Sequence, residues 1–166
     1  MILRRHLLKF VAAALAVFST RAAQARDVVP LAGYNYARGS VVISTGSRAL
    51  YYVLGNGQAI RYPVGVGKAG MAWHGRAFVA LKKLHPAWSM PPELGGGGPV
   101  IPGGSPQNPM GAAVLGLDHG NYAIHGTNDP SSIGGYVSHG CIRMHNEDVL
   151  DLYRRVPMGT DVYVTN

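Results

Sequence analysis

Apolar residues in this chain fall mostly into short runs that are separated by turns rich in glycine. Residues 41–44 and 49–54 form two such runs, joined by Thr-Gly-Ser-Arg at 45–48. A third run spans 58–64, and Gly-Asn-Gly at 55–57 separates it from the second. Because glycine and asparagine tolerate the positive φ angles of tight turns, these runs predict strands joined as hairpins.

The same pattern continues through the rest of the chain. Residues 76–84, 112–117 and 122–124 are each predicted to form a strand, and residues 161–164 a closing strand. Many short strands broken by glycine-rich turns favour a β-sandwich or β-barrel. The sequence therefore predicts a mainly β, single-domain protein.

Only one segment has a clear helical period. Val149, Leu152 and Tyr153 share a face at i, i+3, i+4 spacing, and this face is expected to pack on the sheet. Asn146 is predicted to be the N-cap, and Pro157 is predicted to end the helix. The domain should thus contain one short helix after its only cysteine.

Two segments are predicted to lack regular structure. Residues 26–39 show no period and are interpreted as an irregular lead-in. Residues 91–109 contain so many prolines and glycines that a long loop is expected there. A loop of this length is either a simple connection or a functional element such as a binding loop or a lid.

The first 25 residues have the three parts of a secretory signal peptide. Arg4, Arg5 and Lys9 form a basic start, residues 10–18 are apolar, and Ala-Gln-Ala at 23–25 is a cleavage site. The apolar part is far shorter than the roughly 20 residues that cross a bilayer, which favours cleavage over an uncleaved anchor. The paired arginines are also typical of twin-arginine export, and ordinary Sec export fits as well. We expect an exported protein of the periplasm or cell wall without a stable membrane anchor.

Removing this segment changes the charge balance. The chain has 15 Lys and Arg against 8 Asp and Glu, and four of the basic residues lie in 1–25, so 11 remain and the net charge falls to +3. No run of five like charges is left, and the sequence therefore predicts no nucleic-acid partner. A modest positive balance suits a partner that is rich in carboxylates.

The only cysteine, Cys141, lies in a polar, turn-prone segment and not in an apolar run. A lone thiol near histidines is a candidate nucleophile with a base, and a buried, inert thiol is the alternative. A free thiol is only a few per cent ionised at neutral pH and needs a base. His125 is one candidate; His139 is the other, because residues i and i+2 of an extended segment face the same way.

Two motifs carry a resemblance to a known family. His-Gly-Thr-Asn at 125–128 and Ser-His-Gly-Cys-Ile-Arg-Met at 138–144 resemble the active-site signature of the YkuD-type L,D-transpeptidases, which act on bacterial peptidoglycan. The flanking strands and helix are also similar, so the resemblance covers about residues 40–166, the expected catalytic domain. It implies a YkuD-like β-sandwich or barrel without metal or cofactor, whose active-site cysteine is acylated by carbapenems.

The resemblance also implies a role for each motif residue. Cys141 is the implied nucleophile and His125 the implied general base, with its ring held by the carbonyl group of Gly126. The backbone amides of Gly140 and Cys141 are the implied oxyanion donors. The planar guanidinium group of Arg143 can form two parallel hydrogen bonds to a stem-peptide carboxylate. The remaining residues are implied to line the pocket or to bind substrate: Ser138, His139, Thr127 and Asn128.

The implied reaction has two steps. Cys141 attacks the carbonyl at the L-centre of diaminopimelate in a peptidoglycan stem peptide, releases the terminal D-Ala and forms a thioester. An amine then resolves the thioester, which cross-links the wall or attaches an amino acid or a protein such as an outer-membrane lipoprotein. This chemistry would serve peptidoglycan biosynthesis and cell shape. Water in place of the amine would give an L,D-carboxypeptidase or endopeptidase, which is the first alternative.

Two other classes of function are weighed against this one. A metal site would need several of the histidines near the cysteine, but the paired short spacings typical of zinc sites are absent. A non-catalytic wall-binding module would have no need of a nucleophile and a base. The residues considered as metal ligands are His119, His125, His139, His145 and Cys141.

Overall fold

The computed structural model describes residues 27–31 and 35–166 of the chain. The expected signal peptide, residues 1–25, lies outside the described residues. The elements, in chain order, are β1 (Val28–Pro30), β2 (Val41–Ser44), β3 (Ala49–Gly55), β4 (Gln58–Pro63), β5 (Val66–Gly67), β6 (Gly75–Leu84), η1 (Pro92–Leu94), β7 (Ala113–Leu117), β8 (Ala123–His125), η2 (Pro130–Ser132), β9 (Tyr136–Ser138), β10 (Ile142–Arg143), α1 (Asn146–Arg155) and β11 (Asp161–Thr165).

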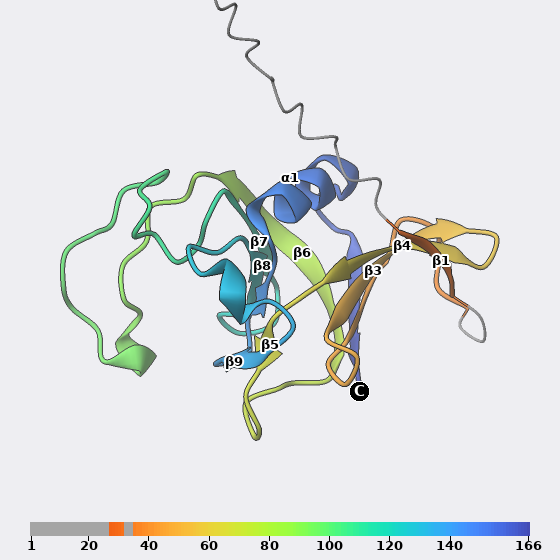
Figure 1. The fold of residues 1–166 in the computed structure, drawn as a ribbon, viewed down its shortest axis with the longest axis horizontal. Coiled ribbons are helices and arrows are strands. Elements are labelled where there is room, and N and C mark those ends of the chain that lie inside the picture. The colour runs from red at the N-terminus through yellow and green to blue at the C-terminus, as the bar shows by residue number, and fades with distance from the viewer. Residues whose placement is uncertain (1–26, 32–34) are drawn as a thin grey trace, which may run out of the picture.

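The main sheet is strongly curved and is organised around the long strand β6 (Figure 1). Its strands follow the order β1-β4-β3-β2-β11-β6-β7-β8-β10, and β5 pairs separately with β9. The first part of β6 pairs with β11 and the later part with β7, with a register shift between Val79 and Leu81. At the far edge, Arg143 of β10 bridges to Gly65, which follows β4 near the opposite edge. The sheet thus curls back on itself, and the predicted mainly β sandwich or barrel is confirmed.

One hydrophobic core joins the two halves of the curved sheet and the helix. Fully burying a large apolar side chain stabilises a fold by about 1.5–3 kcal/mol, so this cluster is the main source of stability. It also fixes β8 and β10, whose Ile124 and Ile142 are both buried. The largest fully buried side chains are Tyr62, Ile43, Leu50, Leu115, Ile124, Ile142, Met144 and Leu152.

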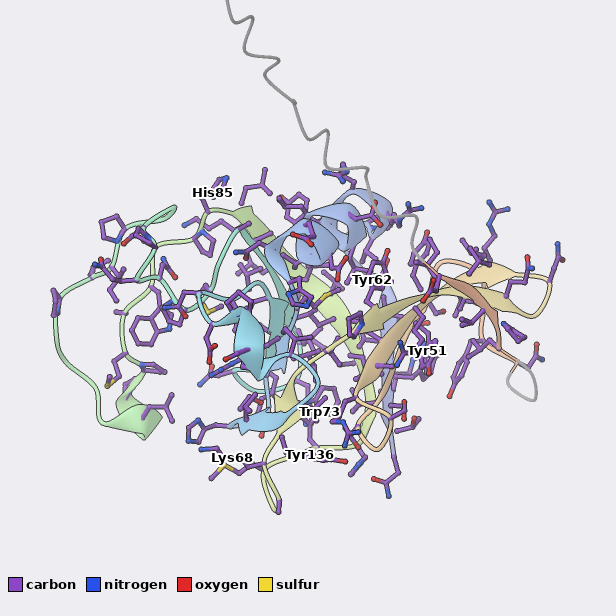
Figure 2. The ribbon with its side chains drawn as sticks, viewed as in Figure 1. Tyr51, Tyr62, Lys68, Trp73, His85 and Tyr136 are labelled. Atoms are coloured by element: carbon purple, nitrogen blue, oxygen red, sulfur yellow. The ribbon has the colours of Figure 1, made fainter. Side chains whose placement is uncertain are left out.

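Polar contacts hold α1 on the sheet in addition to its apolar face. The hydroxyl of Tyr62 donates to Asp151 of α1 at 2.7 Å, and Asp151 also pairs with Arg155 at 2.8 Å. Tyr62 is labelled in Figure 2, close to the helix. Lys82 of β6 donates to the carbonyl oxygens of Tyr153 and Val156, which lie at the end of α1, where a positive charge is favourable. These contacts therefore hold the middle and the C-terminal end of the helix.

The hydrophobic pattern predicted the longer elements correctly. Strands β2, β3, β4, β6, β7 and β11 lie close to their predicted ranges, and α1 buries Val149 and Leu152 as its period indicated. The predicted hairpin turn has positive φ at Gly55, Asn56 and Gly57. Among the described residues, no helix has the length and apolar character needed to span a membrane.

Two predictions of local structure are wrong. Residues 26–39 are not wholly irregular, since Val28–Pro30 forms β1 and pairs with β4, with Val28 opposite Ile60. A strand of three residues is too short to show a period, and the same holds for β5, β9 and β10. Asn146 is not the N-cap of α1, because His145 holds that position and the side chain of Asn146 is bonded outside the helix.

The segment 91–109 is a long loop, as predicted, and its base is fixed. Backbone bonds in both directions join Trp88 and Ile101. Asn108 is buried, and its side-chain amide donates to the carbonyl oxygen of Pro86 at 2.8 Å. The loop therefore returns to the end of β6 before β7 begins.

Candidate active site

The parallel pairing of β8 with β10 brings the two motifs together. Arg143 of β10 lies directly opposite His125, the last residue of β8. Cys141 precedes Arg143 by two positions, so we expect the side chains of Cys141 and His125 to lie on the same face of the sheet. Two residues on neighbouring strands that are offset by two positions have Cα atoms about 8 Å apart, and a cysteine and a histidine side chain can span this distance. The register thus places the candidate nucleophile beside the candidate base.

The ring of His125 is buried and oriented by the backbone. Its side chain is only slightly exposed, and Nδ1 lies 2.6 Å from the carbonyl oxygen of Gly126. Because a carbonyl oxygen only accepts hydrogen bonds, Nδ1 carries the hydrogen and Nε2 is left as the proton acceptor of the neutral ring. The contact between the ring and Gly126 is the one that the resemblance implied.

Burial lowers the pKa of His125 from its ordinary 6.5 to about 4. Hydrogen bonds to the backbone of Gly126 and Pro109 act in the opposite direction, and the positive charge of Arg143 lowers the pKa further. His125 is therefore neutral at pH 7, which is the form that can accept a proton from a thiol. This favours a general base over an imidazolium–thiolate pair formed in advance.

We expect the free energy of unfolding to fall as the pH is lowered from 6.5 towards 4. The unfolded chain binds a proton at His125 near pH 6.5 and the folded chain only near pH 4, so protons favour the unfolded state in this window. Above pH 6.5 His125 is neutral in both states, and the free energy of unfolding is then higher than at low pH by up to about 3 kcal/mol. Denaturant titrations of wild type and His125→Asn at a series of pH values measure it. An equal pH dependence in both proteins would contradict the assignment.

The turn before Cys141 is held by the side chain of Ser138. Its Oγ donates to the carbonyl oxygen of Cys141 at 2.6 Å and accepts the amide hydrogen of Gly140 at 3.1 Å. Cys141 itself is partly buried, and its Sγ lies 3.9 Å from the carbonyl oxygen of Asn121. Ser138 therefore shapes the nucleophile turn from inside the protein. The amide hydrogen of Gly140 is engaged in the same turn.

Glycine is required at position 140 for two reasons. Gly140 has a φ of +123°, and a Cβ atom there would overlap the ring of Tyr122. Tyr122 belongs to an aromatic cluster with Trp73, labelled in Figure 2, and the two ring centroids are 5.6 Å apart. The cluster thus supports the nucleophile turn. Neither Tyr122 nor Trp73 was identified from the sequence, because neither belongs to a motif.

The structure separates His139 from the buried part of the site. The argument for His139 as a rival base assumed an extended segment from 139 to 141, but the chain bends at Gly140. His139 is exposed, whereas His125 is buried. Of the two histidines, only His125 has its ring fixed by a hydrogen bond to the backbone of the neighbouring residue.

Arg143 is partly buried and lies next to both candidates. Its backbone exchanges two hydrogen bonds with Gly65, at 2.8 and 2.9 Å, which fixes its position on β10. Within residues 27–31 and 35–166, its guanidinium group makes no hydrogen bond or ion pair. A cation of this kind beside the thiol can receive a carboxylate of the substrate.

The residues after the base are engaged within the protein. Thr127 is buried, and its hydroxyl accepts from the backbone amide of Asp129 at 3.0 Å, which gives it a role in the turn. Asn128 is exposed, and its side chain donates to the carbonyl oxygen of Gln107 at 3.2 Å. Asn128 thereby connects the motif to the long loop. A hollow of ≈ 210 Å³ lies at this junction, lined by residues that include His85, Ser105, Thr127 and Asn128.

The histidines considered as metal ligands do not form a cluster. His119 stacks on Trp73, with 4.6 Å between the ring centroids, and His145 is the N-cap of α1. In the part of the chain that the structure describes, no group of three or more His, Cys, Asp or Glu side chains is placed to hold a metal ion.

Sequence comparisons point in the same direction as the geometry. The family model for the L,D-transpeptidase catalytic domain (YkuD) matches residues 38–164, which include both motifs. YqjB of Bacillus subtilis is 36% identical over 143 residues, a match that covers 82% of this chain and 74% of YqjB. YbiS of Escherichia coli is 39% identical over 136 residues, which cover 75% of this chain and 43% of YbiS. Both relatives are named as L,D-transpeptidases.

Solved structures share the fold at much lower sequence identity. An L,D-transpeptidase from Mycobacterium smegmatis matches with a TM-score of 0.60 at 17% identity, over 78% of this chain and 59% of that one. L,D-transpeptidase 3 from Mycobacterium tuberculosis, in complex with a faropenem-derived adduct, has a TM-score of 0.60 at 18% identity, over 78% of this chain and 60% of that one. The likeness to these two structures is one of fold.

Proposed function

Because the chain belongs to the YkuD family of L,D-transpeptidase catalytic domains, we propose that it transfers peptidoglycan stem peptides through a thioester on Cys141. The family makes it an enzyme of the acyltransferase type. The matched region spans 74% of YqjB but 43% of YbiS, so parts of the longer relatives have no counterpart in the match. The observation that carries the proposal is the neutral, buried His125 in sheet register beside Cys141.

In the first step Cys141 is acylated. Nε2 of His125 takes the thiol proton as the sulfur attacks the carbonyl carbon at the L-centre of the stem peptide, and the carbonyl oxygen becomes an oxyanion. We assign the oxyanion contact to the backbone amide of Cys141, since the amide hydrogen of Gly140 is already donated to Ser138. His125 then returns its proton to the departing amine of the terminal D-Ala, which leaves a thioester and a neutral base.

In the second step an amine resolves the thioester. His125 takes a proton from the attacking amine and returns it to the sulfur as the C–S bond breaks, which restores the thiol. A stem peptide, an amino acid or a protein such as an outer-membrane lipoprotein can supply the amine. Water would release the same acyl group as an acid, so hydrolysis is a side outcome of the same intermediate.

The surrounding residues support an acidic peptide substrate. Arg143 follows Cys141 by two residues and lies opposite His125 in the sheet, and we propose that its guanidinium group forms a bidentate pair with a stem-peptide carboxylate. Exposed His139 and Asn128 border the site and are proposed to contact the substrate. Buried Thr127 is not proposed as a substrate contact, because its polar atoms are bonded within the protein.

The proposed place of action is outside the cytoplasm. Residues 1–25 have the composition of a signal peptide, and a stem-peptide substrate would be met in the periplasm or cell wall. Residues 40–166 are proposed to be the catalytic domain, in keeping with the match over residues 38–164.

The proposal is tested by incubating the purified protein with a disaccharide-tetrapeptide and measuring product masses. We expect loss of the terminal D-Ala and a cross-linked dimer, with a transient adduct on the peptide that contains Cys141. Adding a second amine, such as a free D-amino acid, should produce the corresponding exchange product. A protein that releases no D-Ala and forms no adduct would overturn the proposed function, whereas release without any amine product would assign it to hydrolysis.

A further inference from the structure

We infer that Asn146 is a positioning residue that holds the backbone behind the base His125 and ties it to the segment of the nucleophile. The inference rests on the proposed function, in which His125 accepts the thiol proton. From sequence alone Asn146 was interpreted only as a helix cap. The structure gives its side chain a different set of partners.

The side-chain amide of Asn146 makes three hydrogen bonds to backbone groups outside its helix. Its Oδ1 accepts from the amides of Ala112 and Thr127, at 3.0 and 3.1 Å. Its Nδ2 donates to the carbonyl oxygen of Thr127 at 2.9 Å. A carboxylate has no hydrogen to donate and an alcohol is too short to reach both sides, so this arrangement needs a carboxamide. Asn146 thus clamps Thr127 through both of its backbone polar groups.

The clamp acts on the peptide that orients the base. Gly126 lies between His125 and Thr127, and its carbonyl oxygen receives the hydrogen bond from Nδ1 of His125. The amide of Gly126 donates to the carbonyl oxygen of Ala113 at 3.0 Å, next to Ala112, which Asn146 also holds. Fixing Ala112 and Thr127 therefore fixes the direction of the Gly126 carbonyl, and with it the tautomer and the ring plane of His125.

Two glycines leave the space that the Asn146 amide occupies. A Cβ atom on Gly111 or on Gly126 would overlap Oδ1 of Asn146. These glycines lie on different segments, one before β7 and one after β8, and both make room for the same atom. This observation is independent of the hydrogen bonds, and it gives a reason for the glycine that follows His125.

The clamp also links the base to the nucleophile. Asn146 begins α1 directly after the segment that carries Cys141 and β10, and the amide of Met144 donates to the carbonyl oxygen of His125 at 2.8 Å. Removing the Asn146 side chain would therefore loosen the segment 125–127 relative to Cys141, while β8 and β10 stay paired. The expected effect is a weaker base, not the loss of the thiol.

The test measures the rate of alkylation of Cys141 by iodoacetamide as a function of pH, which requires no stem peptide. We expect Asn146→Ala to slow alkylation by about tenfold at neutral pH and little above the ordinary thiol pKa of about 8.5, where the thiol ionises without help. In a His125→Ala background, Asn146→Ala should have no further effect. Tyr62→Phe is the matched control, since it removes a buried hydrogen bond to Asp151 of the same helix; it should lower the thermal midpoint without changing the alkylation rate.

Several results would overturn the inference. One is a neutral-pH rate unchanged in Asn146→Ala, and another is an equal slowing in the presence and absence of His125. If Asn146→Ala does not fold, Asn146→Asp replaces it, because the carboxylate keeps both acceptor bonds and loses only the donation to Thr127. The two proposals can fail separately. If both His125→Ala and Asn146→Ala slow alkylation but the wild-type protein transfers no stem peptide, the proposed function is refuted and this inference stands.

Discussion

Replacing Cys141 by serine is expected to reduce the transfer of stem peptides by on the order of 10³-fold or more. The reason is the weakness of the base. With a pKa of about 4, His125 can draw a proton from a thiol during attack, because the ordinary thiol pKa is only about 8.5. A serine hydroxyl is far less acidic, so the same base cannot activate it. Single-turnover assays with disaccharide-tetrapeptide, followed by mass measurement of the acylated protein, report the loss directly.

The fold should survive this substitution, which keeps the experiment interpretable. Cys141 is partly buried, and serine differs from cysteine only in a smaller chalcogen atom, so the substitution leaves no large cavity and adds no bulk. Circular dichroism and the thermal midpoint should therefore match the wild type. Cys141→Ala serves as the matched variant without any nucleophile. Activity within about tenfold of wild type in either folded variant would remove Cys141 from the mechanism.

The local pattern of the chain was sufficient to predict the longer elements. Short apolar runs and a Gly-Asn-Gly turn predicted the hairpin of β3 and β4, and the i, i+3, i+4 spacing of Val149, Leu152 and Tyr153 predicted the inner face of α1. Each of these signals arises within about ten consecutive residues. The short strands β1, β5, β9 and β10 carry no such signal, since they are stabilised by distant partners and not by their own period.

The central contact of the site depends on one of those short strands. The segment of Cys141 is brought next to that of His125 because β10 pairs in parallel with β8, and nothing in the residues around Cys141 specifies that pairing. The motifs indicated which residues belong together, but the register came from the fold. The same limit explains why Asn146 was interpreted as a cap: asparagine suits both roles, and only the positions of Ala112 and Thr127 decide between them.

The sequence also could not predict how Gly140 is used. Gly140 was expected to donate an oxyanion hydrogen bond, but the hydroxyl of Ser138 accepts its amide hydrogen, and Tyr122 fills the space where a side chain would be. Both contacts depend on the chain bending between His139 and Cys141. That bend also removes the extended geometry on which the argument for His139 as the base rested, so His125 stays the predicted base.

Acylation of Cys141 by a carbapenem should slow far more in His125→Ala than in His139→Ala. A strained β-lactam carbonyl reacts with any activated thiol that can stabilise the oxyanion, so labelling reports thiol activation without a natural substrate. A positioned general base contributes about 10²–10⁴-fold, and His125 is the buried, oriented histidine. Exposed His139 should contribute less than about tenfold. The rate of mass gain on the peptide that contains Cys141 measures both effects.

The pH dependence of this labelling separates a base from a structural histidine. If His125 acts by taking the thiol proton, raising the pH should restore part of the labelling rate in His125→Ala. Near the ordinary thiol pKa of about 8.5, the thiol of Cys141 ionises without a base. If His125 only supports the fold, the loss should persist at every pH and should follow the thermal midpoint of the variant. Equal labelling with and without His125 would exclude it as the base, and a larger loss in His139→Ala would transfer the role to the exposed ring. Because burial keeps His125 neutral down to about pH 4, wild-type labelling should also lose no rate through protonation of this base between neutral pH and about pH 5.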